Sequence, residues 1–271
     1  RRPATLGLRV TLAPRIRHET EDAPPSTGFR SQALATCGYL FTGGQIGAPY
    51  QPGEPVRELA PDFEGQVQAA LTHLTAVTHA AGANLHDVVE LSAFTTVAGG
   101  EEVVRRQARN LLGFDVPLYN PVTVMDCAMH GDVELDWVVR LEGGPDPVEA
   151  VETLRPFMHG GSDGVVRSGP FLIRNGATGH GADMTEQAES LLDDLAAELA
   201  PFGAGLADLA KLTVYIQAFD VYPAFDQVTR RRFADFVPPT RSVIVAPDIT
   251  GTSLLRIDAL ATMQVQEAAQ E

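Results

Sequence analysis

Hydrophobic residues recur at helical spacing in two stretches of the chain that lie far apart, at 67–77 and 188–199. A glycine follows each stretch, Gly82 and Gly203, at the place where a helix end favours a left-handed residue. Both stretches therefore predict amphipathic helices with one buried face. Two further helices are expected at about 101–112 and 223–236.

Short runs of apolar and β-branched residues, which are typical of strands, alternate with these helices. In each half of the chain one run precedes the first helix, one lies between the helices and two close the half. The expected strands are 39–42, 88–95, 122–125 and 133–141 in the first half, and 171–174, 209–217, 243–246 and 254–262 in the second. We expect each closing pair to form a hairpin-like meander.

The two halves repeat one another. Residues 82–94 return as 203–215, with Gly, Ala, Leu, Asp and Leu at matching places. The repeat predicts two α+β domains in tandem, each a sheet with two helices on one face. Gly-Gly-Pro-Asp-Pro at 143–147 indicates the connection, so we expect domains at 1–145 and 146–271. The bare face of each sheet would then need a partner.

Composition excludes several classes of protein. The net charge of −15 over 271 residues argues against a nucleic-acid partner, which needs a basic surface. No apolar run approaches the ~18 residues that span a bilayer. Cys37 and Cys127 lie in apolar runs and suggest neither a disulfide framework nor a zinc site. We expect a cytoplasmic protein with no metal, no nucleic acid and no membrane partner.

Three motifs carry a family resemblance: LFTGGQIG at 40–47, AAGANLHDVV at 80–89 and PPTRSV at 238–243. In this order the chain resembles the Rid family (reactive intermediate deaminase, YjgF-like) over roughly 28–142 and 160–265. The resemblance implies a chorismate-mutase-like fold and a trimeric barrel with clefts between subunits. It also implies cofactor-free hydrolysis of imines or enamines. The ligand would be a small anionic metabolite.

The resemblance also assigns roles to single residues. The family arginine that holds the substrate carboxylate corresponds to Arg241 in the second half and to Tyr119 in the first. The family glutamate that orients or activates water, fifteen residues later, corresponds to Glu134 in the first half and to Arg256 in the second. Each half therefore keeps only part of the set.

Further positions follow from the same comparison. The family's glycine loop corresponds to Gly44 and Gln45 in the first half and to Gly176 in the second, and its cleft tyrosine corresponds to Arg30. Pro121, two residues after Tyr119, removes a backbone N–H that the family has. On this basis Glu134, Tyr119 and Arg241 are the candidate catalytic residues. The candidate binding residues are Arg241, Arg256, Arg30, Gly44, Gln45 and Gly176.

Simpler interpretations of these residues stay open. Arg241 and Arg256 suit ion pairs, the latter with Asp258, and Glu134 suits a solvated strand face. Tyr119 suits packing, and Arg30 suits the surface.

Three functions are compatible with this pattern: hydrolytic deamination, a diverged lyase, cyclase or tautomerase of a specialised biosynthetic pathway, and metabolite binding without catalysis. Because two domains cannot close a three-domain ring, we expect a homotrimer with six domains. In it, a ring of first halves would stack on a ring of second halves.

Overall fold

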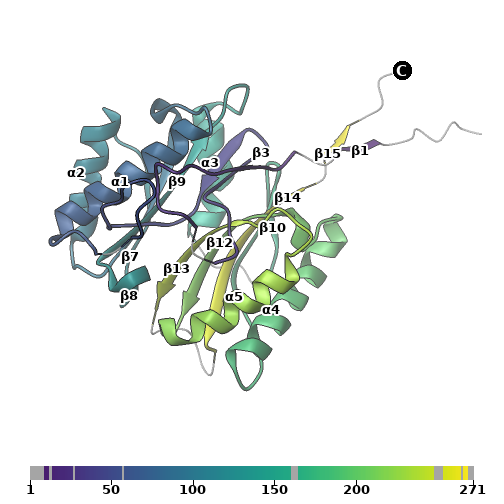
Figure 1. Cartoon of the computed structure of the whole chain (residues 1–271). Helices are drawn as coiled ribbons and strands as arrows, with labels where there is room; N and C mark the ends of the chain where they lie inside the picture. The colour runs from purple at the N-terminus through teal and green to yellow at the C-terminus, as the bar shows by residue number, and fades with distance from the viewer. Residues whose placement is uncertain are drawn as a thin grey trace, which may run out of the picture.

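The computed structural model describes residues 9–11, 14–26, 28–56, 58–159, 164–246, 253–263 and 265–267. Two large sheets face each other, with α1 and α2 on one outer side of the molecule and α4 and α5 on the other (Figure 1). A separate two-stranded sheet joins β1 (Arg9–Thr11) to β15 (Val265–Glu267) near the chain ends. Within the described part of the chain, no helix is long and apolar enough to cross a bilayer.

The first sheet has the strand order β2-β3-β4-β9-β6-β7, with β5 added beside β9. Its strands are β2 (Ile16–His18), β3 (Ala33–Thr36), β4 (Tyr39–Thr42), β5 (Gln45–Ile46), β6 (Val88–Thr95), β7 (Leu118–Thr123) and β9 (Val133–Arg140). Helices α1 (Phe63–Ala80) and α2 (Gly100–Leu112) cover one face. The side chain of Asp62 caps α1 by accepting the N–H of Gly65.

The second sheet has the order β10-β11-β14-β12-β13-β8. Its strands are β10 (Val166–Ser168), β11 (Phe171–Thr178), β12 (Leu209–Ile216), β13 (Thr240–Val245) and β14 (Leu255–Thr262), with β8 (Asp126–Cys127) contributed by the first half. Helices α4 (Met184–Leu199) and α5 (Tyr222–Arg232) cover one face. Asp183 caps α4 as Asp62 caps α1.

The two halves share one strand order, as the repeat predicts. Strands β3, β4, β9, β6 and β7 correspond to β10, β11, β14, β12 and β13. Glu134 of β9 pairs with Ile46, and the equivalent Arg256 of β14 pairs with Thr178. Gly44 and Gly176 each lie two residues before these partners, so the two glycines correspond. The α+β class and the tandem arrangement are confirmed. The boundary between 145 and 146 stays a prediction.

The predicted hairpin of closing strands is wrong in both halves. β6 lies between β7 and β9, parallel to β7 and antiparallel to β9. β12 lies between β13 and β14 in the same way. The helix-rich connection that precedes β7 and β13 brings each back parallel to the strand before it, which a hairpin cannot do. Each half thus contains a crossover beside a central strand.

β7 also contains a β-bulge that its counterpart β13 lacks. Ser92 lies opposite Tyr119, but Phe94 lies opposite Val122, so two residues of β7 face one residue of β6. In the second half the pairing runs without interruption. Pro121 sits in the bulge, where its missing N–H disturbs the ladder least.

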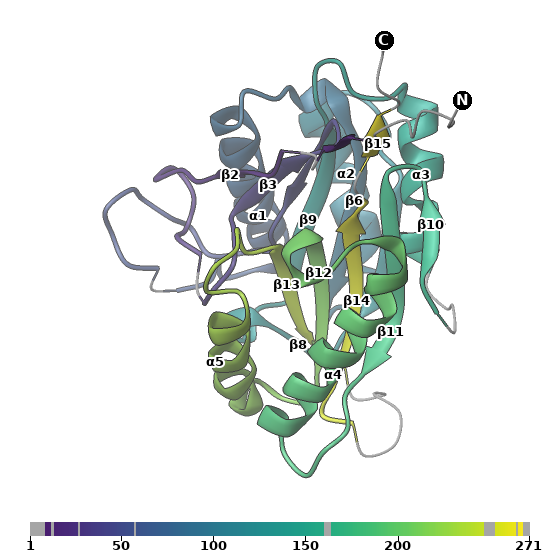
Figure 2. The same cartoon turned by 90° about the vertical axis from the view of Figure 1, so that its right-hand side faces the viewer.

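A third helix, α3 (Pro147–His159), was missed by the sequence analysis, which placed only a connection there. It lies against the inner faces of both sheets, beside β10 in Figure 2. One apolar cluster joins its Ala150 and Leu154 to Phe41 of the first sheet and Phe171 of the second. The expectation that each inner face is bare is therefore wrong, because the chain covers both faces itself.

Candidate functional site

The two halves meet along β13, and this seam brings residues of both halves together. The N–H of Gly44 donates to the carbonyl of Arg241 at 3.1 Å. The N–H of Val243 donates to Glu134 Oε1 at 3.0 Å. β8 of the first half pairs with β13 further along. Arg241 and Glu134, which the sequence assigned to different clefts, therefore lie at the same seam.

Glu134 is an enclosed carboxyl group near neutrality. Its side chain is 1% exposed, and Oε2 has no hydrogen-bond partner among the described residues. Burial raises the pKa of Glu134 to about 7, while the charge of Arg30 and the Val243 N–H limit the rise. The interpretation of Glu134 as a solvated strand residue is wrong. A carboxyl group with this pKa can both take and give a proton near pH 7.

Arg241 is buried at the seam, where residues of α5 hold its guanidinium group. Nη2 lies 2.8 Å from Asp226 Oδ1 and 2.7 Å from the Tyr222 hydroxyl. Nη1 donates to Thr229 Oγ1 at 3.1 Å, and Nε has no partner among the described residues. The ring of Phe225 lies 5.3 Å below the charge. Arg241 is thus already ion-paired within the chain.

Arg30 reaches across the seam from the first half. Its Nη1 donates to the carbonyl of Arg241 at 2.7 Å, and its Nε is buried without a partner in the described part of the chain. Burial lowers the pKa of Arg30, and the charges of Tyr222 and Glu134 oppose this effect. The interpretation as a surface residue is wrong for the guanidinium group. Arg30 is the positive charge beside Glu134.

Asp226 and Tyr222 are site residues that the sequence analysis missed. Burial works against ionisation of Asp226, but the Phe29 N–H and Arg241 outweigh it and hold the pKa of Asp226 below its usual value. A side chain at Gly28 would come within 2.8 Å of the Tyr222 hydroxyl. A signal was present for Asp226, which shares one face of the predicted helix with Thr229 and Phe225, while Tyr222 lies just before that helix.

The remaining predicted residues lie in different places. Gln45 follows Gly44 into β5, and its side chain donates to the carbonyl of Gly43 at 3.3 Å. Gly176 and Arg256 lie in the second half, on the paired strands β11 and β14. There the guanidinium of Arg256 stacks 4.0 Å from the ring centre of Tyr215. The side chain of Tyr119 lies outside the described residues, so its proposed role stays a prediction.

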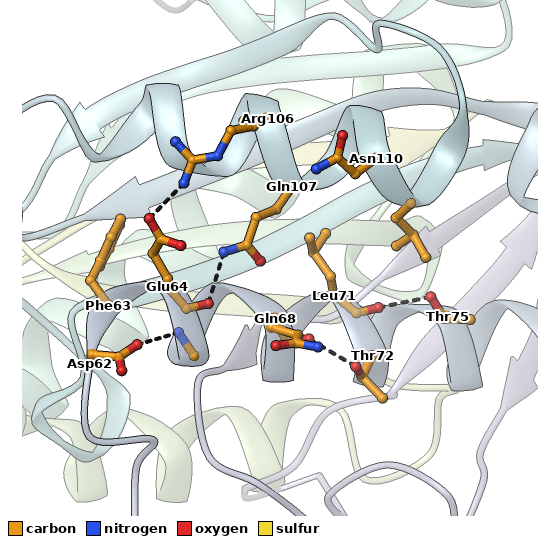
Figure 3. A pocket seen from close by; sticks show the side chains of 12 residues that line it. Asp62, Phe63, Glu64, Gln68, Leu71, Thr72, Thr75, Arg106, Gln107 and Asn110 are labelled. Atoms are coloured by element: carbon orange, nitrogen blue, oxygen red, sulfur yellow. Dashed lines mark hydrogen bonds and ion pairs between the residues drawn. The ribbon is translucent and has the colours of Figure 1, made fainter.

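A groove of about 1020 Å³ lies elsewhere, on the outer surface between α1 and α2 (Figure 3). Hydrogen bonds from Arg106 and Gln107 to Glu64 cross it. None of the predicted site residues lines this groove. Among the described residues, no cluster of three or more His, Cys, Asp or Glu side chains is placed to hold a metal ion.

Comparisons with known proteins match parts of this chain. Residues 20–139 match the family model described as Endoribonuclease L-PSP. A RutC family protein of Pyrococcus horikoshii is 35% identical over 75 residues, which are 28% of this chain and 57% of that protein. A 2-iminobutanoate/2-iminopropanoate deaminase of Dermatophagoides farinae is 26% identical over 131 residues, 48% of this chain and all of that protein. This chain thus matches little more than half of the Pyrococcus relative's length.

Solved structures align with about half of the chain. RidA from a Psychrobacter species is 24% identical, with a TM-score of 0.41, and the match covers 46% of this chain and 99% of that one. TdcF of E. coli, solved with bound serine, is 23% identical, with a TM-score of 0.42, over 46% and 98% of the two chains. The first half of the chain thus matches the L-PSP family model, and the second half repeats the strand order of the first.

Proposed function

We propose that the chain acts on a small anionic imine or enamine in the cleft between its halves, by hydrolytic deamination. The observation that carries the proposal is a set of three buried polar atoms without partners among the described residues: Glu134 Oε2, Arg30 Nε and Arg241 Nε. Leaving such atoms unpaired costs about 1–3 kcal/mol each, so the cleft suits a small polar ligand or a water molecule.

In this reaction water adds to the imine carbon and Glu134 takes a proton from it. The same proton then passes to the nitrogen. As the carbonyl group forms, the proton of the added hydroxyl group follows through Glu134 to the nitrogen, which leaves as ammonia. A carboxyl group with a pKa of about 7 suits both steps. Arg30 would hold the substrate's carboxylate, because the guanidinium of Arg241 is already paired with Asp226. Arg241 would then position the wall of the cleft or share the carboxylate.

The test is ammonia release from enamines formed in situ from several amino acids. We expect release by the wild type and a loss of ~10²–10⁴ in kcat for Glu134→Gln, which removes the proton-transfer group. The amide oxygen of Gln can still accept the Val243 N–H, so the seam is kept. Glu64→Gln, on the outer surface of α1, is the matched control and should retain the wild-type rate. An unchanged rate in Glu134→Gln would remove Glu134 from the mechanism.

A second candidate is metabolite binding without catalysis. The pairing of Arg241 with Asp226 favours it, since the chain supplies its own carboxylate where the family is expected to bind the substrate's. Saturable binding of a carboxylated metabolite with no ammonia release would support this candidate. The homotrimer stays a prediction. The homotrimer was predicted because the helices of each half leave one sheet face uncovered, and residues of both these faces pack with α3 in one apolar cluster.

A further inference from the structure

A buried lysine of the second half contacts two groups of the first half. The side chain of Lys211, in β12, is 1% exposed, and its amine lies 2.7 Å from Asp136 Oδ1. The same amine donates to the carbonyl of Thr42 at 3.1 Å. A buried ammonium group is costly unless it is paired and hydrogen-bonded, and these two contacts meet both needs. Lys211 therefore fixes Asp136 and Thr42 relative to one another.

The two partners of Lys211 belong to the two segments that frame Glu134. Asp136 follows Glu134 by two residues in β9, so the two side chains project from the same face of the strand. Thr42 ends β4 and leads into the loop of Gly44, where an added Cβ would come within 2.7 Å of the carboxyl carbon of Glu134. One amine thus joins the strand that carries the acid to the loop that packs against it.

Asp136 extends this contact to β13. Its Oδ2 accepts from the Ser242 hydroxyl at 2.5 Å. The next residue of β13, Val243, donates its N–H to Glu134 Oε1 at 3.0 Å. Because these two bonds come from neighbouring residues of one strand, a shift of Asp136 would also move the N–H that Glu134 accepts. Lys211 thus acts, through Asp136, on the hydrogen-bond donor of the Glu134 carboxyl group.

Among the described residues, the counterpart of Lys211 in the first half makes a different contact. Glu90 of β6 occupies the same position, because Glu90 pairs with Val138 and Lys211 pairs with Leu260, which are matching residues of β9 and β14. Glu90 is also buried, but its Oε1 accepts from Ser92 of its own strand at 2.6 Å. The repeat therefore supplies a buried polar residue at the same position whose hydrogen bond stays within its own strand.

We infer that Lys211 is a positioning residue, which holds Glu134 between β13 and the glycine loop without touching the substrate. The inference rests on the proposed role of Glu134 in proton transfer. A carboxyl group that takes a proton from water and returns it to the nitrogen must lie within hydrogen-bonding reach of both, and a misplacement of about 1 Å can lower a rate about 10²-fold. Arg30, which would hold the substrate's carboxylate, is bound to a different group, the carbonyl of Arg241. Loss of Lys211 should therefore lower kcat and leave KM nearly unchanged.

The double variant Lys211→Met with Asp136→Asn tests the inference, because it removes both charges of the buried pair and leaves neither unpaired. We expect a folded chain by circular dichroism, a fall of about 10-fold to 100-fold in kcat for ammonia release and a KM within about 2-fold of the wild type. Each kcat is taken at the pH maximum of that protein, because the charge of Asp136 also raises the pKa of Glu134. A folded double variant with the wild-type kcat would overturn the inference.

Glu90→Gln is the matched control, at the same position in the first half. Burial raises the pKa of Glu90 to about 8, so the side chain is mostly protonated at pH 7 and the amide keeps its shape and charge. We expect this variant to keep the wild-type kcat, and an equal loss in both proteins would assign the effect to the buried layer as a whole and overturn the inference. If the double variant fails to fold, Ser242→Ala, which removes only the hydroxyl link between Asp136 and β13, should lower kcat in its place, and an unchanged kcat there would count against Lys211 in the same way.

A measurement that needs no turnover separates this inference from the proposed function. The amide proton of Val243, followed by NMR, should shift with pH as its acceptor Glu134 ionises, and Glu134→Gln assigns that shift. We expect the full shift in the wild type and in Glu90→Gln, and a smaller one in the double variant because the hydrogen bond is no longer held. If the wild type released no ammonia but the double variant lost the Val243 shift, the proposed function would fail and the positioning of Glu134 by Lys211 would stand. An equal Val243 shift in all three proteins would overturn the inference, whatever the value of kcat.

Discussion

Gly44 has to be a glycine because the carboxyl group of Glu134 lies directly against its Cα. A Cβ placed on Gly44 would come within 2.7 Å of the carboxyl carbon of Glu134. The N–H of Gly44 also donates a hydrogen bond to the carbonyl of Arg241 in the other half, which holds the backbone at Gly44 in place. The absence of a side chain at Gly44 thus allows the two halves to pack around the carboxyl group of Glu134.

We expect Gly44→Ala to destabilise the fold by ~1–3 kcal/mol, because the added methyl group must push apart a packed seam. The free energy of unfolding in urea measures the effect. Gly205→Ala is the control, since a Cβ at Gly205 meets no atom within 4 Å and the backbone there is extended. Equal free energies of unfolding for the two variants would show that the seam accommodates the added methyl group without loss of stability.

Helix α5 and the segment around Gly28 and Phe29 act together as the wall that holds Arg241. The Phe29 N–H donates to Asp226 Oδ1 at 2.8 Å, and the same oxygen lies 2.8 Å from the guanidinium. The wall thus joins an element of the second half to a loop of the first. The resemblance supplied Arg241 but not its partner, because an ion pair between a strand and a helix leaves no fixed spacing in the sequence.

We expect Asp226→Ala to destabilise the chain by ~3–5 kcal/mol, because it leaves the buried charge of Arg241 without its partner. Thermal unfolding followed by circular dichroism provides the measurement. Asp220→Ala, an exposed aspartate just before α5, should leave stability near that of the wild type. A small loss in Asp226→Ala would mean that water or a bound anion takes over the pairing.

At the scale of the whole molecule, a buried polar layer joins the two sheets. Lys211 of the second half lies 2.7 Å from Asp136 of the first, with both side chains at most 1% exposed, and Ser242 donates to the same carboxylate at 2.5 Å. Glu90 lies in this layer with Ser92. Burial and the charge of Asp136 raise the pKa of Glu90 to about 8, so Glu90 is mostly protonated at pH 7.

This layer predicts how stability depends on pH. Glu90 and Glu134 hold protons in the folded chain that the unfolded chain releases above the usual value of 4.5. Their contribution to stability is therefore complete below 4.5 and is lost as pH rises through about 7 for Glu134 and about 8 for Glu90. While one group holds its extra proton, the free energy of unfolding falls by ~1.4 kcal/mol per pH unit.

Urea unfolding at a series of pH values checks this prediction. Between about 7 and 8, where Glu134 is largely ionised, we expect Glu90→Gln to remove the remaining fall in stability. Glu64→Gln, which changes an exposed carboxylate, should keep it. The same fall in all three proteins would assign the pH dependence to groups outside this layer.

The sequence by itself determined most of the elements, their repetition and the family resemblance. Apolar spacing is a local property, so it placed α1, α4, β6 and β12 within a few residues of their observed bounds. It also determined that Pro121 cannot donate a hydrogen bond and that Glu134 and Arg241 survive in different halves. The sequence did not determine the strand order, because the parallel pairing of β7 with β6 depends on contacts between residues far apart in the chain.

Only the tertiary structure decided that the two half-sites form one site. Each half, compared separately with the family pattern, keeps only part of the residue set, so the sequence indicated two incomplete clefts. The fold packs β13 of the second half against Gly44 of the first, so Arg241 and Glu134 lie at one seam. The structure also placed α3, a helix whose apolar face matches two separate sheets at once. The role of this apolar face depends on both sheets, because contacts between residues far apart in the sequence determine what α3 packs against.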